Sequence, residues 1–571
     1  MKIRKIQDDI SIVVSGEAGQ GLQTFESLLS KIAKSDGIYV FTYSEVMSRI
    51  RGGNNSTEIR LTSLPGHAYV DRIDLFIPFA PDATRRFYSR IDDTTVIVGE
   101  SENIEESYRN SDNTIEVPFS SMASEAGSKR LSNLVVLGYV CALLRIKMDI
   151  VVGHVEDRFK KAGEEVKKKN RDAISRGYKE GEDHRGSDLL RLDVSRSDEW
   201  ENHMLMDGSS ALGIGALAGG CNFIASYPMS PSTELLVFMA EQAEKFGIVV
   251  EQAEDEINAI NMAIGSWYAG GRAIVTTSGG GYDLMTEGVS LAGAVESPVV
   301  IHLAQRPGPA TGLPTRTEQA DLMLALHAGH GEFPRAIFAP GDYTEAIQLG
   351  CHAFNLADRY QVPVFILTDQ YLLDSSRMVP PVDMNGLKAE VNIVETDDNY
   401  ARYAWSENGV STRGIPGYGK GLVCADSDEH DEGGYITEDF TVSKRMMEKR
   451  LEKYAGLQKE CISPRLFGEK EYRYILLAWG STLQSIREAI EKAGRDDVAL
   501  LHFSQVHPLH GSTSGYLEKA EKIITVENNA TAQFGNYVKS VTGFAFNSHI
   551  LKYDGMPFSV EELTQEIKNL K

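Results

Sequence analysis

Short β-branched runs alternate with stretches of helical spacing along most of the chain. The first 200 residues predict a helix at 22–32 and strands at 10–14, 39–42, 58–61, 75–78, 95–99 and 114–117. The pattern restarts after Gly208, with helices expected at 211–219 and 234–246 and strands at 223–226, 272–276, 299–303, 336–339 and 362–367. A last unit has strands at 474–479, 498–503 and 522–526. Strands that alternate with helices predict an α/β fold with parallel sheets covered by helices.

Two polar stretches interrupt this pattern. Residues 158–196 are highly charged, and within them we expect a solvated helix at 164–175 and a linker at 180–186. The second stretch is irregular, with a solvated acidic loop around His430 and a helix at 442–453. The expected domains are therefore 1–190, 200–380 and 466–571, joined by an irregular acidic connecting segment at 381–465.

Composition excludes several classes of protein. The formal net charge of -23 argues against a nucleic-acid partner, because phosphate binding requires clustered Lys and Arg. The longest apolar stretch, Leu134 to Leu144, is too short to span a bilayer, and the N-terminus lacks the apolar run of a signal peptide. The five cysteines have no C-x-x-C spacing, which argues against a disulfide framework or an iron–sulfur cluster on this chain. We expect a cytoplasmic protein that does not enter a membrane.

The segment 227–234 reads Tyr-Pro-Met-Ser-Pro-Ser-Thr-Glu and follows a predicted strand. Ser230 and Pro231 are typical of a helix N-cap and first helical position. The N-terminus of a helix favours a bound anion, although the same pattern is typical of any strand-to-helix turn.

Glu256 precedes a run of apolar and small residues from Ile257 to Ser266. A glutamate at the start of a helix is usually an exposed residue favoured by the helix dipole. An apolar setting would instead raise its pKa. Glu254, two positions earlier, is the competing carboxyl.

Three further loops follow predicted strands. Residues 276–281 read Thr-Thr-Ser-Gly-Gly-Gly, where glycines allow close approach of a ligand or a tight turn. In 305–315, Arg306 is either a solvent-exposed charge or a bidentate clamp for a carboxylate. Residues 16–21 contain three glycines and match neither a dinucleotide-binding nor a Walker A pattern.

Together with Ser48-Arg49-Ile50-Arg51-Gly52-Gly53, these motifs resemble the alpha subunit of the 2-oxoacid:ferredoxin oxidoreductases, of the 2-oxoglutarate type with a gamma domain fused at the N-terminus. The resemblance covers nearly the entire chain. It implies a gamma domain, a thiamine diphosphate pyrimidine-binding domain and a transketolase C-terminal-like domain, in that order. The chain departs from the family where Met229 and Ser230 replace Ile and Thr, and where the family's Ser-Gly-Pro-Gly lacks its Pro.

The resemblance also implies roles for individual residues. Glu256 is the catalytic residue, because a buried carboxyl hydrogen-bonded to the cofactor's pyrimidine N1′ promotes the tautomer that acts as the base. The other implied roles are substrate binding by Tyr227, Ser230, Arg306 and Thr315, thiamine diphosphate binding by Pro228, Ser278, Gly279 and Gly280, and contact with coenzyme A by Gly19, Gly21 and Arg51. Arg316 or a residue of a partner would read the distal carboxylate of 2-oxoglutarate. No metal site is expected on this chain.

One absence indicates a partner. The chain has no Gly-Asp-Gly, the motif with which thiamine enzymes anchor Mg²⁺ and the diphosphate. By the resemblance, a beta subunit supplies the Mg²⁺, the diphosphate site and a [4Fe–4S] cluster in an α2β2 assembly, and ferredoxin accepts the electrons.

The implied reaction is coenzyme A-dependent oxidative decarboxylation of a 2-oxoacid, with 2-oxoglutarate to succinyl-CoA preferred, or the reverse reductive carboxylation. Three alternatives stay open. They are a broad-range, branched-chain or pyruvate-type oxidoreductase, a subunit of a non-redox thiamine enzyme, and a non-catalytic scaffold subunit.

Overall fold

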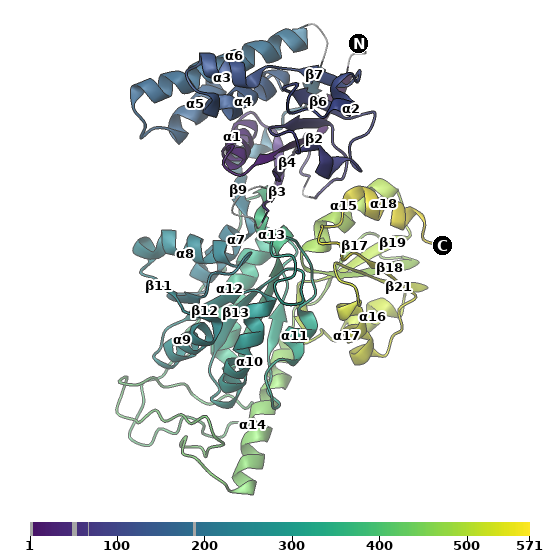
Figure 1. The fold of residues 1–571 in the computed structure, drawn as a ribbon. Coiled ribbons are helices and arrows are strands. Elements are labelled where there is room, and N and C mark those ends of the chain that lie inside the picture. The colour runs from purple at the N-terminus through teal and green to yellow at the C-terminus, as the bar shows by residue number, and fades with distance from the viewer. Residues whose placement is uncertain (1–3, 48–53, 67, 187–189) are drawn as a thin grey trace. The chain divides into compact units, whose positions relative to one another are not determined.

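The computed structural model describes residues 4–47, 54–66, 68–186 and 190–571. Packing divides the chain into two compact units, the first formed by Met1–Met206 and Ser375–Pro381 and the second by Asp207–Asp374 and Val382–Lys571. Each unit combines sheets with helices (Figure 1), which confirms the expected α/β class. The functional limits 1–190, 200–380, 381–465 and 466–571 stay predictions.

The first unit is built on an eight-stranded sheet in the order β7-β6-β5-β2-β4-β3-β16-β9. Its strands are β2 (Asp9–Glu17), β3 (Tyr39–Glu45), β4 (Asn54–Thr62), β5 (Leu75–Pro78), β6 (Val96–Gly99), β7 (Thr114–Glu116), β9 (Met204–Asp207) and β16 (Ser375–Val379). A separate parallel pair joins β1 (Arg4–Gln7) to β8 (Leu190–Asp193). The large sheet is mixed and not parallel as expected, because β4 pairs antiparallel with both β2 and β3.

The helices of the first unit correct one prediction. They are α1 (Leu22–Ser35), α2 (Glu106–Arg109), α3 (Phe119–Glu125), α4 (Ser132–Leu143), α5 (Met148–Arg158) and α6 (Glu164–Gly186), with 3₁₀ turns η1 (Thr84–Phe87), η2 (Lys129–Leu131) and η3 (Glu199–Asn202). The linker expected at 180–186 is wrong, since these residues end α6. A Cβ at Gly177 would lie 1.8 Å from the Val135 carbonyl oxygen, and one at Gly181 would lie 2.5 Å from that of Tyr139. The glycines let α6 contact the backbone of α4. The charged residues that suggested a linker describe only the outer face of α6.

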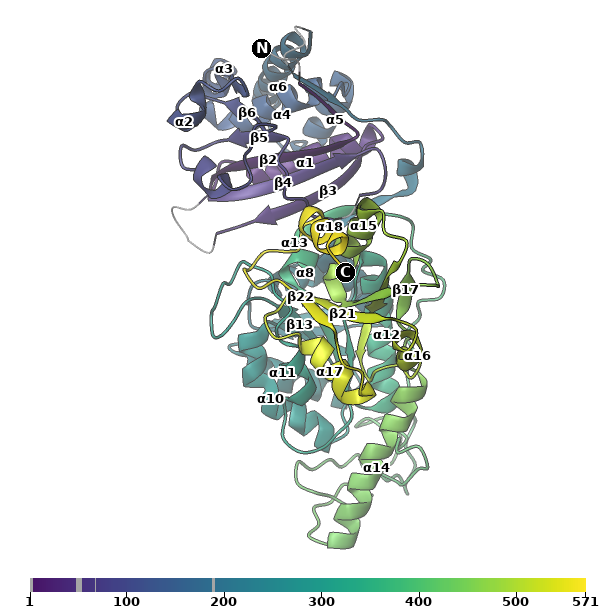
Figure 2. The same ribbon diagram turned by 90° about the vertical axis from the view of Figure 1, so that its right-hand side faces the viewer.

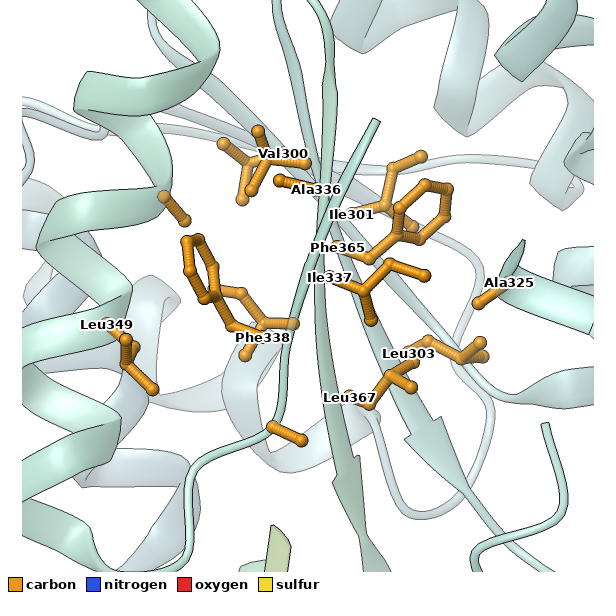
Figure 3. Close-up of a cluster of buried hydrophobic side chains, with 14 of the residues drawn as sticks. Val300, Ile301, Leu303, Ala325, Ala336, Ile337, Phe338, Leu349, Phe365 and Leu367 are labelled. Carbon is orange, nitrogen blue, oxygen red and sulfur yellow. The ribbon is translucent and has the colours of Figure 1, made fainter. Parts of the chain in front are cut away.

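The second unit contains a seven-stranded sheet in the order β11-β10-β12-β13-β15-β14-β20. Its strands are β10 (Phe223–Ser226), β11 (Val249–Gln252), β12 (Ala273–Thr277), β13 (Val299–Gln305), β14 (Ala336–Phe338), β15 (Pro363–Asp369) and β20 (Gln505–His507). The helices around it are α7 (Gly208–Ala218), α8 (Thr233–Phe246), α9 (Glu256–Tyr268), α10 (Gly279–Ala294), α11 (Leu322–His327), α12 (Tyr343–Tyr360) and α13 (Gln370–Asp374). Only β20 is antiparallel to its neighbour. Figure 3 shows side chains of β13, β14 and β15 in the core, including Ile301, Ile337 and Phe365.

Four adjacent strands of this sheet bring the predicted motifs together. β11, β10, β12 and β13 are parallel neighbours, so their carboxyl ends lie at one edge of the sheet. The segments that leave this edge begin at Ala253, Tyr227, Ser278 and Arg306. In open parallel sheets, ligands bind at this edge.

The same unit includes a five-stranded sheet, β17-β19-β18-β21-β22. Its elements are β17 (Arg465–Phe467), β18 (Tyr474–Trp479), β19 (Val498–Phe503), β21 (Lys522–Glu527), β22 (Ser548–Leu551), η4 (Gly480–Thr482), α15 (Leu483–Ala493), α16 (Thr513–Leu517), α17 (Gln533–Thr542) and α18 (Val560–Lys568). Figure 2 shows α15 and α18 on one face of this sheet and α16 and α17 on the other. Between the two sheets in sequence, residues 380–439 have no helix or strand, and the expected helix at 442–453 is confirmed as part of α14 (Phe440–Lys459).

Candidate functional site

Glu256 is the first residue of α9, and the side chain of Asp255 caps the helix by accepting the Asn258 N–H at 2.8 Å. The side chain of Glu256 is buried, with 3% exposure, whereas Glu254 is exposed. Burial, aided by the charge of Asp255, raises the pKa of Glu256 above its usual range. Its Oε1 is buried and has no hydrogen-bond partner among the described residues. The structure thus separates the two competing carboxyls by burial.

The first turn of α10 lies directly against this carboxyl. The predicted loop at 276–281 is in fact the end of β12 and the start of α10, which begins at Gly279. A Cβ at Gly281 would lie 2.4 Å from Glu256 Oε1, and one at Gly279 would lie 2.6 Å from Asp321 Oδ1. The hydroxyl of Ser278 is buried and lacks a partner among the described residues. Two carboxyls therefore flank a helix start at which positions 279 and 281 have room only for glycine.

The segment that follows β10 differs from its prediction in one respect. α8 begins at Thr233, and the Ser232 hydroxyl donates to the Met229 carbonyl oxygen at 2.7 Å. Ser230 is therefore not the N-cap. Its side chain is exposed beside the half-buried Pro228, and Tyr227 is 41% exposed. These side chains remain open to a ligand or a partner.

Arg306 and Ser230 meet in the structure. The Nη1 of Arg306 donates to the Ser230 carbonyl oxygen at 2.7 Å. Partial burial lowers the pKa of Arg306, while the nearby Asp321 opposes this shift. Thr315 lies half-buried in the turn that continues this loop.

Contacts from the segment that joins β21 to α17 hold the loop after Arg306 in place. The N–H of Gln319 donates to the Asn528 carbonyl oxygen at 2.7 Å. The side chain of Gln533 donates to the Ala320 carbonyl oxygen at 2.7 Å and accepts the Met323 N–H at 3.0 Å. Asn528 and Gln533 thus fix the backbone on both sides of Asp321.

Asp321 is a carboxyl that the sequence did not single out. Burial, together with the charges of Glu318 and Asp283, raises its pKa to about 7, and Arg306 opposes the shift. Its Oδ2 is buried without a hydrogen-bond partner among the described residues. The sequence shows only that Asp321 lies in a polar loop, three residues after the end of Arg316-Thr317-Glu318. Such a position carries no signal of burial.

The N-terminal glycine loop lines a cavity of its own in the first unit. Gly19 and Gly21 have φ values of 90° and 81°, and Gly21 precedes α1. They border a cavity of about 340 Å³ together with Glu17, Ser44 and Thr57. Arg51, the third residue expected on the coenzyme A side, lies outside the described residues.

The acidic loop around His430 is only partly solvated: its carboxylates are exposed or half-buried, but its histidine is not. His430 is fully buried and lies 4.0 Å from the ring of Tyr403, centroid to centroid. Glu429 accepts two hydrogen bonds from Arg450, at 2.9 and 2.7 Å. Paired charges and ring packing hold the loop, which charge counting alone does not reveal. Within the described ranges, no three His, Cys, Asp or Glu side chains are grouped to hold a metal ion.

In the part of the chain that the structure describes, no helix combines the length and apolar character required to cross a membrane.

Comparison with known proteins places two parts of the chain in known families. Residues 214–449 match the family described as pyruvate flavodoxin/ferredoxin oxidoreductase, thiamine diphosphate-binding. Residues 11–180 match the family described as pyruvate ferredoxin/flavodoxin oxidoreductase. The fold and site therefore define a thiamine diphosphate-binding oxidoreductase subunit.

Individual relatives make the assignment more specific. The chain is 31% identical to the 2-oxoacid:ferredoxin oxidoreductase subunit alpha of Sulfolobus sp, over 98% of this chain and 96% of the relative. It is 32% identical to the 2-oxoglutarate synthase subunit KorA of Archaeoglobus fulgidus, over 59% of this chain and 90% of the relative. The chain belongs to the 2-oxoacid:ferredoxin oxidoreductase alpha-subunit family, as the sequence motifs indicated. As an alpha subunit, it is one member of an assembly of several subunits.

A solved structure has the same fold over the whole chain. It is the 2-oxoglutarate:ferredoxin oxidoreductase from Magnetococcus marinus, with 2-oxoglutarate, coenzyme A and succinyl-CoA bound. The TM-score is 0.91 at 28% identity, and the match covers 98% of this chain and 99% of that chain.

Proposed function

We propose that the chain is the alpha subunit of a thiamine diphosphate-dependent enzyme that oxidatively decarboxylates a 2-oxoacid, with 2-oxoglutarate as the preferred substrate. Coenzyme A takes the acyl group and ferredoxin takes the electrons, and the reverse reductive carboxylation uses the same groups. One observation carries the proposal: the buried Glu256 carboxyl lies against the glycine turn of α10 without a partner for Oε1.

The residues around Glu256 fit the pyrimidine end of thiamine diphosphate. A flat ring can approach the backbone of Gly279 and Gly280, since the Cβ of a residue at 280 would have only the Ala310 carbonyl oxygen within 4 Å, at 3.7 Å. The buried Ser278 hydroxyl and Glu256 Oε1 offer polar groups to such a ring. Pro228 would contribute to the same wall.

Glu256 would hold a proton at Oε1. Its raised pKa keeps the carboxyl protonated to higher pH than in water, because burial disfavours the anion. A protonated carboxyl can share its proton with a ring nitrogen, whereas a carboxylate has no proton to share. When bound, thiamine diphosphate supplies the nucleophile and electron sink that decarboxylation requires.

The carboxylate of the oxoacid would face Arg306. Tyr227, Ser230 and Thr315 would line the same side, and the Arg306–Ser230 bond orients the guanidinium. Asp321 would set the strength of this interaction, because its negative charge, when ionised, offsets that of Arg306. Arg316 remains the proposed contact for a distal carboxylate.

Partner subunits would complete the site. The sequence lacks Gly-Asp-Gly, so a beta subunit would supply Mg²⁺, the diphosphate site and a [4Fe–4S] cluster in an α2β2 assembly. Residues 1–190 would form the gamma domain, 200–380 the pyrimidine-binding domain and 466–571 the transketolase C-terminal-like domain. Gly19, Gly21 and Arg51 would face coenzyme A. A cytoplasmic location fits soluble ferredoxin as the electron acceptor.

A broad range of oxoacids is the second candidate. Met229 and Ser230 stand where the family usually has Ile and Thr, and the Sulfolobus relative is named for 2-oxoacids in general. A change of side chain at this position alters the space beside the substrate.

An anaerobic assay tests both candidates. The chain, copurified with its beta subunit, is given coenzyme A, thiamine diphosphate and a panel of oxoacids, and viologen reduction is followed. We expect the highest kcat/KM with 2-oxoglutarate. Similar values across pyruvate and branched-chain oxoacids would favour the broad-range enzyme. No reduction with cofactor and cluster present would contradict both and favour a non-redox or scaffold subunit.

A further inference from the structure

A cavity of about 450 Å³ lies beside the second half of α9. Gly265, which lines it, is nine residues beyond Glu256, or about 14 Å along the helix axis at 1.5 Å per residue. The opposite wall comes from the irregular segment, through Arg402, Arg413 and Ala425. The cavity is therefore separate from the proposed reaction site.

The lining is mainly apolar. α9 contributes Ile264 and Trp267, α10 contributes Leu291, and the loop after α10 contributes Val295 and Pro298. The volume falls in the range of about 300–1,000 Å³ typical of small-molecule sites. These walls suit the apolar body of a ligand.

Two buried ion clusters adjoin the cavity, and both contain more cations than anions. The Glu296 carboxylate forms ion pairs with Lys449, Oε1 to Nζ 2.7 Å, and with Lys453, Oε2 to Nζ 2.5 Å. All three side chains are at most 1% exposed. Arg402, itself 5% exposed, donates to the Glu296 carbonyl oxygen at 2.8 Å. The charge of Arg402 also acts on the Glu296 carboxylate, so one carboxylate lies near three cations.

The second cluster is centred on Asp358. Its two carboxylate oxygens accept hydrogen bonds from Arg272 at 2.5 Å and from Arg413 at 2.7 Å. All three side chains are at most 6% exposed. No other carboxylate among the described residues is within 4.0 Å of the cations of either cluster. Together, two carboxylates face five cations, a formal excess of three positive charges in a chain whose net charge is -23.

Buried cations without anions are unfavourable in a medium of low dielectric constant. Two guanidinium nitrogens that belong to cavity-lining residues, Arg402 Nη1 and Arg413 Nε, have no hydrogen-bond partner among the described residues. Burial also lowers the pKa of Lys453 to about 8, with Glu296 opposing the shift and Lys449 adding to it. An anion in the cavity would relieve this excess.

We propose that the cavity binds a small organic acid, with its carboxylate toward Arg402 and Arg413 and its apolar body against Ile264, Trp267 and Leu291. Neither surface alone defines the ligand: an inorganic anion would leave the apolar walls unused, and a neutral hydrocarbon would leave the charges uncompensated. The proposal does not depend on the reaction proposed above.

Gly265 allows a test that blocks the cavity and leaves the charges in place. A Cβ at this position meets no atom within 4 Å, so Leu can replace Gly in α9 without a collision of its Cβ, and it favours the helix more than Gly does. Gly265→Ala is the matched control, because it changes the same backbone position and leaves most of the space.

Binding is measured by calorimetry on the chain copurified with its partner, with octanoate, phenylacetate and octylamine as probes. We expect saturable binding of at least one acid, no binding of octylamine, a loss of affinity of about tenfold or more in Gly265→Leu as the Leu side chain fills the space, and retained binding in Gly265→Ala. Preference between the two acids distinguishes an aliphatic from an aryl ligand. Failure of both acids to bind, equal binding of octylamine, or unchanged affinity in Gly265→Leu would each overturn the proposal. The amine comparison needs no variant and stands even if Gly265→Leu fails to fold.

Discussion

The carboxyl of Glu256 lies against the Cα of Gly281, so closely that a Cβ at residue 281 would be 2.4 Å from Oε1. The two residues belong to neighbouring helices, α9 and α10, that follow β11 and β12. Glycine at this position leaves the carboxyl buried but open on the side where Oε1 has no partner. A ligand of the right shape can therefore reach a group that water reaches poorly.

Replacing Glu256 with Gln should lower kcat of the assembled enzyme by about 10²–10⁴-fold, the usual contribution of a positioned acid or base. The variant should also unfold at a higher temperature at pH 7, because the neutral amide avoids the cost of ionising a buried carboxyl. Viologen reduction and thermal unfolding measure the two effects.

Glu254→Gln is the matched control, since Glu254 is exposed two residues earlier, and it should change neither quantity appreciably. Full activity in Glu256→Gln would show that the carboxyl is not required and would favour the scaffold alternative.

Replacing Gly281 with Ala should reduce both activity and stability. The new methyl group would collide with Glu256 Oε1 and with Thr277 Oγ1, which would be 2.2 Å away. Overpacking of this kind typically destabilises by about 1–3 kcal/mol. Denaturant unfolding and viologen reduction check the prediction.

Gly280→Ala is the comparison for folding, because its Cβ has only one neighbour within 4 Å, at 3.7 Å. It should be as stable as the parent or more so, by up to about 1 kcal/mol from helix propensity. If Gly281→Ala were equally stable, the contact between α10 and Glu256 would not be as tight as the structure has it.

Asp321 should make oxoacid binding depend on pH. Its pKa of about 7 means that the carboxyl is neutral below pH 7 and ionised above it, where it offsets the charge of Arg306. We expect KM for the oxoacid to rise by about fivefold or less between pH 6 and 8, as for a partly exposed ion pair. In Asp321→Asn, which is neutral at every pH, this rise should disappear while kcat changes little.

The free energy of unfolding should also depend on the ionisation of Asp321, within a defined pH range. The folded-state pKa of about 7 exceeds the ordinary value of 3.8, so the folded state binds the extra proton between these values. The contribution of Asp321 is fully present below about pH 4 and is lost as the pH rises to 7. If the free energy of unfolding of Asp321→Asn varied with pH in parallel with that of the parent, this assignment would be contradicted. It would also be contradicted if Glu318→Gln by itself removed the pH dependence.

Replacing Gly177 with Ala should destabilise the first unit strongly. The Cβ would lie 1.8 Å from the Val135 carbonyl oxygen, a backbone atom that cannot move aside without shifting α4. We expect a loss of about 3 kcal/mol or more, at the upper end for overpacking, measured by denaturant unfolding. Gly153→Ala in α5 meets no atom within 4 Å and should be neutral or stabilising. Equal effects of the two substitutions would contradict the close backbone contact between α6 and α4.

The periodic pattern predicted much of the second unit because the central strands of its sheets are buried on both faces. β10 was expected at 223–226 and β13 from 299 to 303, and both are strands in the structure. Local rules failed where distant segments decided the outcome. The sequence around 180–186 is polar and contains glycine like a linker, yet Gly181 lies against α4, which is more than 35 residues earlier.

By itself, the sequence determined the α/β class, the family and the motifs that leave one edge of the sheet, because periodicity and short motifs are local properties. Burial is not local: the family resemblance favoured Glu256 over Glu254, but only packing against α10 shows that Glu256 is buried while Glu254 is exposed. The same holds for Asp321, which became a neighbour of Gly279 through contacts from Asn528 and Gln533, some 200 residues later in the chain. The tertiary structure decided which charges are isolated from water, and with that their pKa values and what they can bind.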